Sequence, residues 1–395
     1  DGAMANVIVL QRDMMFASRK NPAFITDPVL LDQPGQVLAV WMNTQSPGNP
    51  VAFPVHVNSL ELFGPALPPG ERLTCLVTNA FTDDVLLSSN LDLVKADGRV
   101  WARFTGWTDR RFELPGRFRV NSLTETDHHL SERWDQLSDT RSGLTVFRVT
   151  NDLLDAGFLD AGAGVWMRTL ASIVLSRKER ELWHKMPAQS PRRAEWLIGR
   201  AVAKDAVRSY LLLEFGLGLL SADIEIETRP GGAPFVHGEW TRVIDGEVPR
   251  VSISHVSGFT VAAVASGDTM GLGIDVERIE RMNDDAADIA FTPSEEVILS
   301  SLAQDERQAW RARMWCAKEA MAKALGEGMK GRPDMFIVAR IDRASGEIEM
   351  EASNDGQPSH ASVQRSATIH TLVDGDFAFA SCILTSSDPA SATAE

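Results

Sequence analysis

The stretch Gly271-Leu-Gly-Ile-Asp-Val-Glu277, followed further along the chain by Trp315-Cys-Ala-Lys-Glu-Ala-Met-Ala-Lys323, decides how this sequence is interpreted. In the first stretch Asp275 and Glu277 alternate with apolar residues. On a β-strand these two carboxylates therefore point to the same face. An Asp-x-Glu pair on a strand is most often a solvated face, so the pattern needs a partner elsewhere in the chain before it indicates a site.

The second stretch supplies such a partner on a helix. Trp315, Glu319 and Lys323 are spaced four residues apart and share one helical face, beside a core stripe that includes Met314 and Met321. By itself a Glu–Lys pair at this spacing is an ordinary surface contact worth about 0.2–0.5 kcal/mol. Together, two carboxylates from a strand and one from a helix suit a hard divalent cation, and Mg²⁺ prefers such oxygen ligands.

Composition and charge bound the class of protein. The chain has 395 residues, more than one typical domain, and its 44% hydrophobic and 24% charged content is ordinary for a globular protein. The formal charge of −15 argues against nucleic-acid binding, and no apolar run is long enough to cross a membrane. Cys75, Cys316 and Cys382 form neither a disulfide framework nor a metal motif, which fits a reducing, cytoplasmic location.

Residues 6–115 are predicted to be mostly strand around one helix. Gln36–Trp41 is the helical exception, and Asp32 with Pro34 just before it fits the start of a helix. Asp97-Gly98 lies between two apolar runs and predicts a hairpin. One helix wrapped by antiparallel strands is a hot-dog-like arrangement. The strand-like runs are Val51–Leu62, Glu71–Phe81, Asp84–Lys95 and Arg99–Glu113.

Residues 116–164 are polar or Gly-rich and are predicted to be a linker. Beyond it three patterns typical of helix starts occur, at Ser176-Arg-Lys-Glu179, Ser190-Pro191 and Thr292-Pro-Ser-Glu295. With strands between and after them, residues 165–385 are predicted to be an α+β domain. The closing strand-like runs are Met335–Ile341 and Phe377–Leu384, and residues 386–395 are small and polar and are predicted to be disordered.

Two further groups of polar residues have both an ordinary and a functional interpretation. Arg193, Arg200 and Lys204 are seven and four residues apart on one face of the helix that begins at Ser190-Pro191. Such a basic face is usually solvated, but a planar guanidinium can also bind phosphate oxygens in pairs. Ser254 and His255 end a strand-like segment, where a single histidine is usually structural.

Gly-Ile-Asp-x-Glu followed by Trp-x-x-Lys-Glu-Ala-x-x-Lys resembles the signature of the 4′-phosphopantetheinyl transferases, in their larger, two-lobed class typified by the surfactin-synthetase activator. The resemblance implies two similar α+β lobes, roughly residues 165–250 and 251–385, with the active site in the cleft between them. It also implies Mg²⁺, coenzyme A as substrate and an acyl carrier protein as partner.

The resemblance carries roles onto the matching positions. Asp275, Glu277 and Glu319 would hold the Mg²⁺. Glu319, or a water that it holds, would take the proton of the carrier serine, and Lys323 would offset charge on the bridging phosphates or protonate the leaving group. Glu319, Lys323 and Asp275 are therefore the expected catalytic residues. Lys318 is a secondary candidate for a phosphate contact, with Lys323.

The coenzyme A contacts follow in the same way. The helix stretch Arg193-Ala-Glu-Trp-Leu-Ile-Gly-Arg200-x-x-x-Lys204 resembles the phosphate-binding helix of the family, and Val251-Ser-Ile-Ser254-His255 resembles its phosphate-contacting strand end. Two positions depart from the family pattern. Ala233 replaces the basic residue of a Gly-Lys-Pro turn, where Arg229 is near enough to substitute. Val256 replaces a hydroxyl residue, so that contact is lost or comes from Ser257.

A second resemblance covers about the first 110 residues. Leu31-Asp32-Gln-Pro-Gly-Gln36 resembles the Leu-Asp-x-x-x-Gln/His motif of polyketide synthase dehydratase domains, and Val100–Trp107 resembles their closing strand. Asp32 would then be the dehydratase acid, accompanied by Gln36. The His-x-x-x-Gly-x-x-x-x-Pro motif of that family does not occur, so the region is expected to be the second half of such a domain. Asp32 as an ordinary helix cap is the alternative.

Three functions are compatible with these patterns. The first is a transferase fused to the C-terminus of an enediyne-type iterative polyketide synthase, which loads the carrier domain of its own synthase. The second is a non-catalytic scaffold, supported by the departures at Ala233 and Val256 and opposed by the intact acidic set. The third is part of a dehydratase that needs a missing histidine-bearing repeat.

Overall fold

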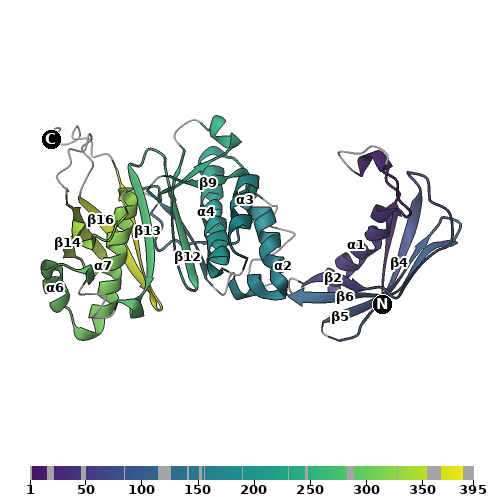
Figure 1. Ribbon diagram of the computed structural model, residues 1–395, viewed down its shortest axis with the longest axis horizontal. Helices are drawn as coiled ribbons and strands as arrows, with labels where there is room; N and C mark the ends of the chain where they lie inside the picture. The colour runs from purple at the N-terminus through teal and green to yellow at the C-terminus, as the bar shows by residue number, and fades with distance from the viewer. Residues whose placement is uncertain are drawn as a thin grey trace. The chain divides into compact units, whose positions relative to one another are not determined.

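The chain folds as two compact units, residues 1–114 and 115–395, as the computed structural model in Figure 1 shows. No described helix has the length and apolar character needed to cross a membrane. The structure describes residues 2–15, 22–45, 50–83, 85–113, 126–139, 142–150, 154, 156–188, 190–229, 231–244, 248–282, 289–326, 328–353 and 366–385. Residues 116–125 of the expected linker and the expected disordered tail, residues 386–395, lie outside this description.

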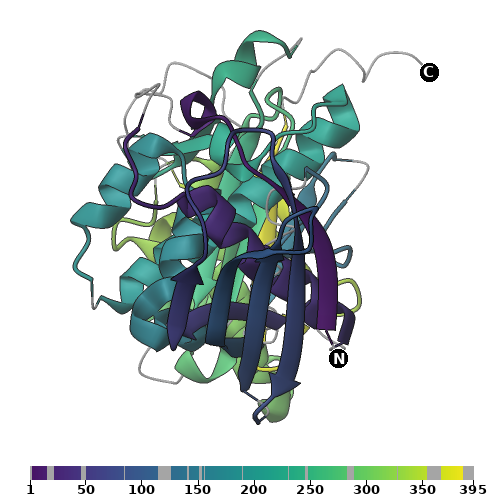
Figure 2. The same ribbon diagram turned by 90° about the vertical axis from the view of Figure 1, so that its right-hand side faces the viewer.

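The first unit is one helix packed on an antiparallel sheet, which confirms the hot-dog-like prediction. Leu30 and Leu38 of helix α1 are buried in the same core as Leu91 and Phe104 of the sheet, whose strands are seen in Figure 2. The strand order is β1-β4-β5-β6-β2, with β3 also paired to β6. The elements are β1 Gly2–Ile8, α1 Pro28–Gln45, β2 Pro50–His56, β3 Ser59–Leu62, β4 Arg72–Phe81, β5 Leu86–Val94 and β6 Val100–Glu113.

Two local predictions for this unit have different outcomes. The hairpin at Asp97-Gly98 is confirmed, because Gly98 has a φ of 82° and links β5 to β6. The predicted start of the helix is wrong. The carboxylate of Asp27 accepts the N–H of Leu30 at 2.9 Å, so α1 begins with Asp27-Pro28, and Asp32 and Pro34 lie inside it.

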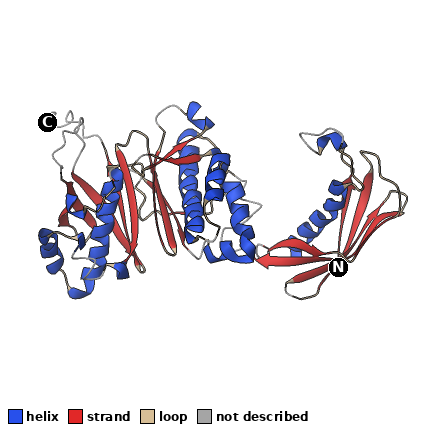
Figure 3. Cartoon of the chain, viewed as in Figure 1, coloured by secondary structure: helices blue, strands red, loops and turns tan. Residues whose placement is uncertain are grey.

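The second unit contains two sheets with the same internal order, each covered by one long helix (Figures 1 and 3). Strands β8-β12-β11-β10-β9 of the first sheet correspond to β13-β17-β16-β15-β14 of the second, and β7 is added at the edge of the first. The elements of the first lobe are β7 Glu132–Arg133, β8 Thr145–Thr150, α2 Ala156–Val174, α3 Arg177–Lys185, α4 Pro191–Phe215, β9 Glu225–Thr228, β10 Pro234–His237, β11 Arg250–Val256 and β12 Phe259–Ala265. Those of the second are β13 Gly271–Arg278, α6 Pro293–Ser300, α7 Gln304–Ala324, β14 Phe336–Ile341, β15 Glu347–Ala352, β16 Ser366–Asp374 and β17 Phe377–Leu384.

A buried ion pair in the first lobe ties its helices to its sheet. Ser176 and Glu179 form the predicted capping box at the start of α3. The Glu179 carboxylate also receives the ammonium of Lys204 on α4 and, at 3.1 Å, the N–H of Ile226 on β9. Lys204 donates a further hydrogen bond to the carbonyl oxygen of Val174 at 2.8 Å. The Glu179 carboxylate therefore accepts hydrogen bonds from the start of a helix, from a buried ammonium and from an edge strand.

The second lobe repeats this device. Thr292 and Glu295 form the predicted capping box at the start of α6. Glu295 accepts the Lys318 ammonium of α7 at 2.7 Å and the N–H of Val338 on β14 at 2.8 Å. Lys318 also donates to the carbonyl oxygen of Ala290 at 2.9 Å. The same contacts between equivalent elements make the two lobes a structural repeat, as the two-lobed prediction requires.

The predicted boundaries of the lobes need correction. Strand β8 lies within the expected linker, yet it pairs with β12 from Thr150↔Phe259 to Val264↔Thr145, so it belongs to the first sheet. Strands β11 and β12 were expected in the second lobe, but they pair with β10 and β8 of the first. The lobes therefore change between β12 and β13. The boundary between the lobes is set by strand pairing between residues that are far apart in the sequence. Local composition does not reveal such pairing.

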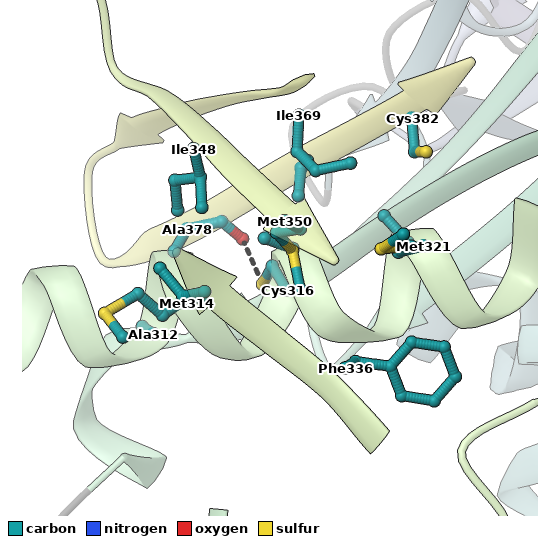
Figure 4. Close-up of a cluster of buried hydrophobic side chains, with 14 of the residues drawn as sticks. Ala312, Met314, Cys316, Met321, Phe336, Ile348, Met350, Ile369, Ala378 and Cys382 are labelled. Atoms are coloured by element: carbon teal, nitrogen blue, oxygen red, sulfur yellow. Dashed lines mark hydrogen bonds between the residues drawn. The ribbon is translucent and has the colours of Figure 1, made fainter. Parts of the chain in front are cut away.

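The core of the second lobe lies between α7 and its sheet. Figure 4 shows Met314, Cys316 and Met321 of the helix among Ile348 and Ile369 of the strands, all buried. The Cys316 thiol donates to the carbonyl oxygen of Ala378 at 3.3 Å (Figure 4). All three cysteines are free and buried, so they are structural residues here.

Candidate active site

The glycines of the motif bring α7 directly onto strand β13. A Cβ at Gly273 would lie 1.8 Å from the carbonyl oxygen of Ala320, and one at Gly271 would lie 2.1 Å from that of Ala324. Because side chains alternate along a strand, Asp275 and Glu277 follow these glycines on the face toward the helix. The motif thus needs small residues where the helix crosses and carboxylates just beyond.

Asp275 is the centre of the site. It is 6% exposed, and its Oδ1 accepts hydrogen bonds from Ser254 Oγ on β11 and from Lys323 Nζ on α7, each at 2.8 Å. Lys323 also donates to the carbonyl oxygen of Ile274 at 2.9 Å. The structure therefore brings together three of the residues that the sequence selected, from two strands and one helix.

The other two carboxylates complete an acidic cluster. Burial raises the pKa of Glu319, the negative charges of Asp275 and Glu277 raise it further, and Lys323 opposes the shift. Glu277 Oε1 accepts the N–H of Arg278 at 2.8 Å. Carboxylates that repel one another beside a single ammonium fit a divalent cation with oxygen ligands.

The three carboxylates of the acidic cluster do not converge on a single point. Among the described residues, Asp275, Glu277 and Glu319 do not bring one oxygen each to within 4.8 Å of one another. Glu277 Oε1 is 3.4 Å from Arg281 instead. Asp275 is held in its position on β13 by the hydrogen bond from Ser254.

A cavity of about 690 Å³ adjoins the Lys323 end of this cluster. It lies where β10, β11 and the start of β13 meet the end of α7, and it includes Lys323, Arg229, Arg250 and Phe235. The Arg229 guanidinium lies 5.1 Å from the centre of the Phe235 ring. Sequence reasoning selected Arg229 but missed Arg250 and Phe235, because only the order of the strands brings them to the cavity.

The basic residues of α4 are placed differently from the prediction. Lys204 is fully buried against Glu179. The guanidinium of Arg193 lies 3.6 Å from the ring centre of Trp183, and that of Arg200 lies 4.4 Å from the ring centre of Trp196. None of the three lines the cavity. This face of α4 packs against α3 and its own tryptophan and does not reach the cavity beside Lys323.

Lys318 is not placed to make the phosphate contact that the sequence suggested. It is fully buried, and its ammonium is shared between Glu295 and the carbonyl oxygens of Ala290 and Pro333. An ammonium with three acceptors has no donor left for a phosphate. It stands next to Glu319 in sequence, but on a helix successive residues point about 100° apart. Lys318 therefore supports α7, while Glu319 faces the acidic cluster.

The side chains of Ser254 and His255 point to opposite faces of β11, as those of successive residues on a strand do. Ser254 faces Asp275, whereas the His255 side chain is 49% exposed and lies 3.8 Å from Glu195 of α4. His255 lines a smaller cavity of about 200 Å³ together with Ser257. Val256 is buried in the core, so the contact that a hydroxyl would make there is absent from its side chain.

Within the described residues of the first lobe, no acidic cluster stands at the equivalent place. Phe259 and Phe377 open equivalent strands, and counting along the paired registers places Phe147 of β8 where Asp275 stands in β13. Phe147 is buried in the first lobe. The repeat thus supplies two similar scaffolds, and the acidic chemistry lies on the second.

In the first unit Asp32 is exposed on α1, and Gln36 Nε2 donates to its Oδ2 at 3.0 Å. His56 lies at the end of β2, with its Nε2 2.8 Å from Asn58 Oδ1. The structure therefore pairs Asp32 with Gln36 as the motif predicts, on a solvent-facing side of the helix.

Comparison with known families divides the chain in the same way. Residues 271–382 match the family model of the 4′-phosphopantetheinyl transferase superfamily, which spans the second lobe. Residues 2–117 match the model of the polyketide synthase dehydratase N-terminal domain. That description differs from the expectation that the region is the second half of a dehydratase domain.

Individual proteins are similar to parts of this chain. A 4′-phosphopantetheinyl transferase of Bacillus subtilis is 26% identical over 200 residues, which is 50% of this chain and 78% of that protein. A holo-[acyl-carrier-protein] synthase of Chloroflexus aurantiacus is 37% identical over 68 residues, 17% of this chain and half of that protein. A solved holo-(acyl-carrier-protein) synthase of Bacillus anthracis is 22% identical, with a TM-score of 0.23, and covers 29% of this chain and 96% of its own. The chain therefore carries a polyketide synthase dehydratase domain region followed by a domain of the 4′-phosphopantetheinyl transferase superfamily.

Proposed function

We propose that this chain transfers 4′-phosphopantetheine from coenzyme A to a serine of an acyl carrier protein, with release of 3′,5′-ADP. The observation that carries the proposal is the set of contacts that joins Asp275, Ser254 and Lys323 beside Glu319, within the segment that matches the transferase superfamily. Reactions at phosphate are catalysed mainly by positioning groups and offsetting charge, and a fixed acidic and basic set serves both tasks.

Magnesium is part of the proposal. Asp275, Glu277 and Glu319 would hold it, since they supply only oxygen ligands and their mutual repulsion is opposed by a single ammonium. Bound there, the ion would act as a Lewis acid on the pyrophosphate of coenzyme A. Ser254 keeps Asp275 oriented through its hydroxyl.

The chain's own residues would handle the protons. Glu319, or a water that it holds, is the proposed base for the serine hydroxyl, because it lies in the acidic cluster close enough to feel the charges of Asp275 and Lys323. Lys323, held by Asp275 and Ile274, is the proposed positive charge on the bridging phosphates and a proton donor to the leaving group.

Coenzyme A would occupy the cavity of about 690 Å³ beside Lys323. Arg229 and Arg250 would contact its phosphates, and Phe235 offers an aromatic face for the adenine. Arg229 would thereby replace the basic residue that is missing at Ala233. His255 lies outside this cavity, and its contact with coenzyme A stays a prediction from the resemblance. Arg193 and Arg200 pack on tryptophan rings outside the cavity, so we assign them no phosphate contact.

The carrier protein would belong to the chain's own polyketide synthase, in the cytoplasm. The dehydratase match over residues 2–117 supports a synthase context, and the enediyne type is our proposal from the sequence patterns. We do not assign dehydratase activity to this chain alone. Asp32 would act only when a histidine-bearing partner segment completes the site, because its described neighbour is Gln36 and not a histidine.

The test is mass spectrometry of an apo acyl carrier protein from a polyketide synthase, incubated with this chain, coenzyme A and Mg²⁺. We expect a gain of one phosphopantetheine group, abolished by EDTA and by Glu319→Ala. Glu296→Ala is the matched control, since Glu296 is a half-buried glutamate of α6 that is not part of the acidic cluster. No mass gain with several carrier proteins would contradict the transferase proposal and favour the scaffold.

A further inference from the structure

Three metal-binding side chains meet on the first lobe, away from the acidic cluster of the second. Glu225 and Glu227 are two residues apart on β9, so they share a face, and the adjacent strand β10 pairs His237 directly with Glu225. One ligand atom of each of the three lies within 4.8 Å of the others, and no other group in the described parts of the chain does this. Ile226 and Val236 point to the opposite face and are buried, which fixes the register of the three.

The distances fit coordination of one ion. His237 Nε2 lies 3.0 Å from Glu227 Oε1 and 3.6 Å from Glu225 Oε2. Ligands held about 2.0–2.2 Å from a tetrahedral Zn²⁺ are roughly 3.3–3.6 Å apart. Small side-chain movements therefore bring all three to a common ion, and a water completes its shell.

Two of the ligand atoms are buried without the hydrogen bonds that such atoms normally make. Glu225 Oε2 and His237 Nε2 are both inaccessible to solvent, and their contacts with Lys178 and Glu227 are ion-pair distances without the geometry of a hydrogen bond. A buried polar atom without a hydrogen bond destabilises the fold. A cation between them would satisfy both atoms at once. Phe235 stacks on the His237 ring at 5.5 Å and limits its rotation.

The site already attracts a positive charge. Lys178 Nζ of α3 lies 3.3 Å from Glu225 Oε2, although its side chain is 68% exposed. This ammonium would compete with a metal for the same oxygen. Because it is flexible and solvated, it can leave at small cost.

We propose that Glu225, Glu227 and His237 form a second divalent-metal site, selective for Zn²⁺ and similar late first-row ions over Mg²⁺. An imidazole nitrogen is a good ligand for Zn²⁺ but not for Mg²⁺, which prefers oxygen. The chain would thus separate its two ions by ligand type, with the all-carboxylate cluster for one and the histidine site for the other. The site lies beside the cavity that contains Lys323, because His237 also lines that cavity.

The test is calorimetric titration of the metal-stripped full chain with Zn²⁺ in excess Mg²⁺, which keeps the acidic cluster of the second lobe occupied. We expect one Zn²⁺ per chain. His237→Asn should weaken its binding by at least about tenfold, the smallest loss usual when even an outer-shell partner is removed. Glu227→Gln should weaken it similarly, and because that side chain is 48% exposed, this variant tests the site without disturbing the core.

Two control variants sharpen the result. His370 faces Glu347 at 3.5 Å across two strands of the second lobe, but with one carboxylate, so His370→Asn should leave the affinity unchanged. Lys178→Met should tighten Zn²⁺ binding by removing the competing charge. Absence of Zn²⁺ binding, or an affinity that neither His237→Asn nor Glu227→Gln lowers in folded protein, would overturn the proposal. Neither result depends on transfer activity, so the proposed function is tested separately.

Discussion

The ammonium of Lys323 lies 2.8 Å from Oδ1 of Asp275, although the two residues are 48 positions apart. The same ammonium donates to the carbonyl oxygen of Ile274, so it is held by backbone as well as by charge. An ammonium has no lone pair to offer a metal, and its place beside the carboxylate makes it a fixed positive charge at the joint of β13 and α7. Asp275 and Lys323 should therefore have separable effects.

Replacing Lys323 by Met should slow phosphopantetheine transfer by about 10²–10³-fold, the usual loss when one charge-stabilising donor is removed. Mg²⁺ affinity should not fall, because Asp275 loses a competing cation. Asp275→Asn should lower both the transfer rate and Mg²⁺ affinity. Rates from mass spectrometry and Mg²⁺ titration of each variant check this. A Lys323→Met protein that loses Mg²⁺ binding but keeps its maximal rate would contradict the assignment.

Gly273→Ala should destabilise the second unit by about 1–3 kcal/mol or more, because its Cβ would lie 1.8 Å from a backbone oxygen of α7 that has no room to move. Gly199→Ala is the matched control with the opposite sign. Its Cβ would lie 3.7 Å from Ile253 within helix α4, and Ala in place of a helical Gly stabilises by about 0.5–1 kcal/mol. Urea unfolding of both variants measures the difference, and equal effects would refute the close-approach argument.

Lys204→Met should lower the free energy of unfolding by about 3–5 kcal/mol, since it leaves the Glu179 carboxylate buried without its main partner. The KM for coenzyme A should stay unchanged. Lys318→Met should destabilise similarly, as its equivalent in the second lobe. Adding Glu179→Gln to Lys204→Met should restore part of the loss. A raised KM with unchanged stability would instead return Lys204 to the phosphate site that the sequence suggested.

The first unit should lose stability as pH rises from about 4 to about 6. Burial raises the pKa of Asp109 from 3.8 to about 6, and its Oδ2 has no hydrogen-bond partner among the described residues. Between these values the folded chain keeps a proton that the unfolded chain has lost, so the free energy of unfolding falls as pH increases.

Asp109→Asn should flatten this pH dependence and stabilise the unit at pH 7 by about 1–3 kcal/mol, the free energy that corresponds to the pKa shift. Denaturant unfolding at several pH values, followed by tryptophan fluorescence, checks it. Glu61→Gln, at an exposed position of β3, is the control and should leave the profile unchanged. A profile that keeps its slope in Asp109→Asn would assign the effect to another group.

Arg229→Met should raise the KM for coenzyme A by about tenfold or more, because a hydrogen bond to a charged group contributes about 1.5–3 kcal/mol. Arg193→Met should leave that KM unchanged, since its guanidinium packs on Trp183 outside the cavity, and should lower stability instead. Steady-state kinetics and thermal unfolding of the two variants separate the effects. The reverse pattern would favour the phosphate-binding helix inferred from the sequence.

Much of the local structure could be predicted because it depends on neighbours in the chain. The capping boxes at Ser176–Glu179 and Thr292–Glu295 form as predicted, since a helix start requires only a side-chain oxygen and an N–H within three residues. The alternation in Gly271–Glu277 likewise determines which side chains share a face. The sequence by itself therefore identified the acidic residues and the helix that faces them.

Only the tertiary structure decided what covers each face. Lys204 and Lys318 carry the charge expected of phosphate ligands, but each is buried against a glutamate more than twenty residues earlier in the chain. Strand β8 belongs to the first sheet because its residues pair with β12 more than a hundred positions away. Residue patterns specify periodicity, whereas long-range pairing is set by the packing of whole elements, so these partners, and the cavity beside Lys323, emerge only in the folded chain.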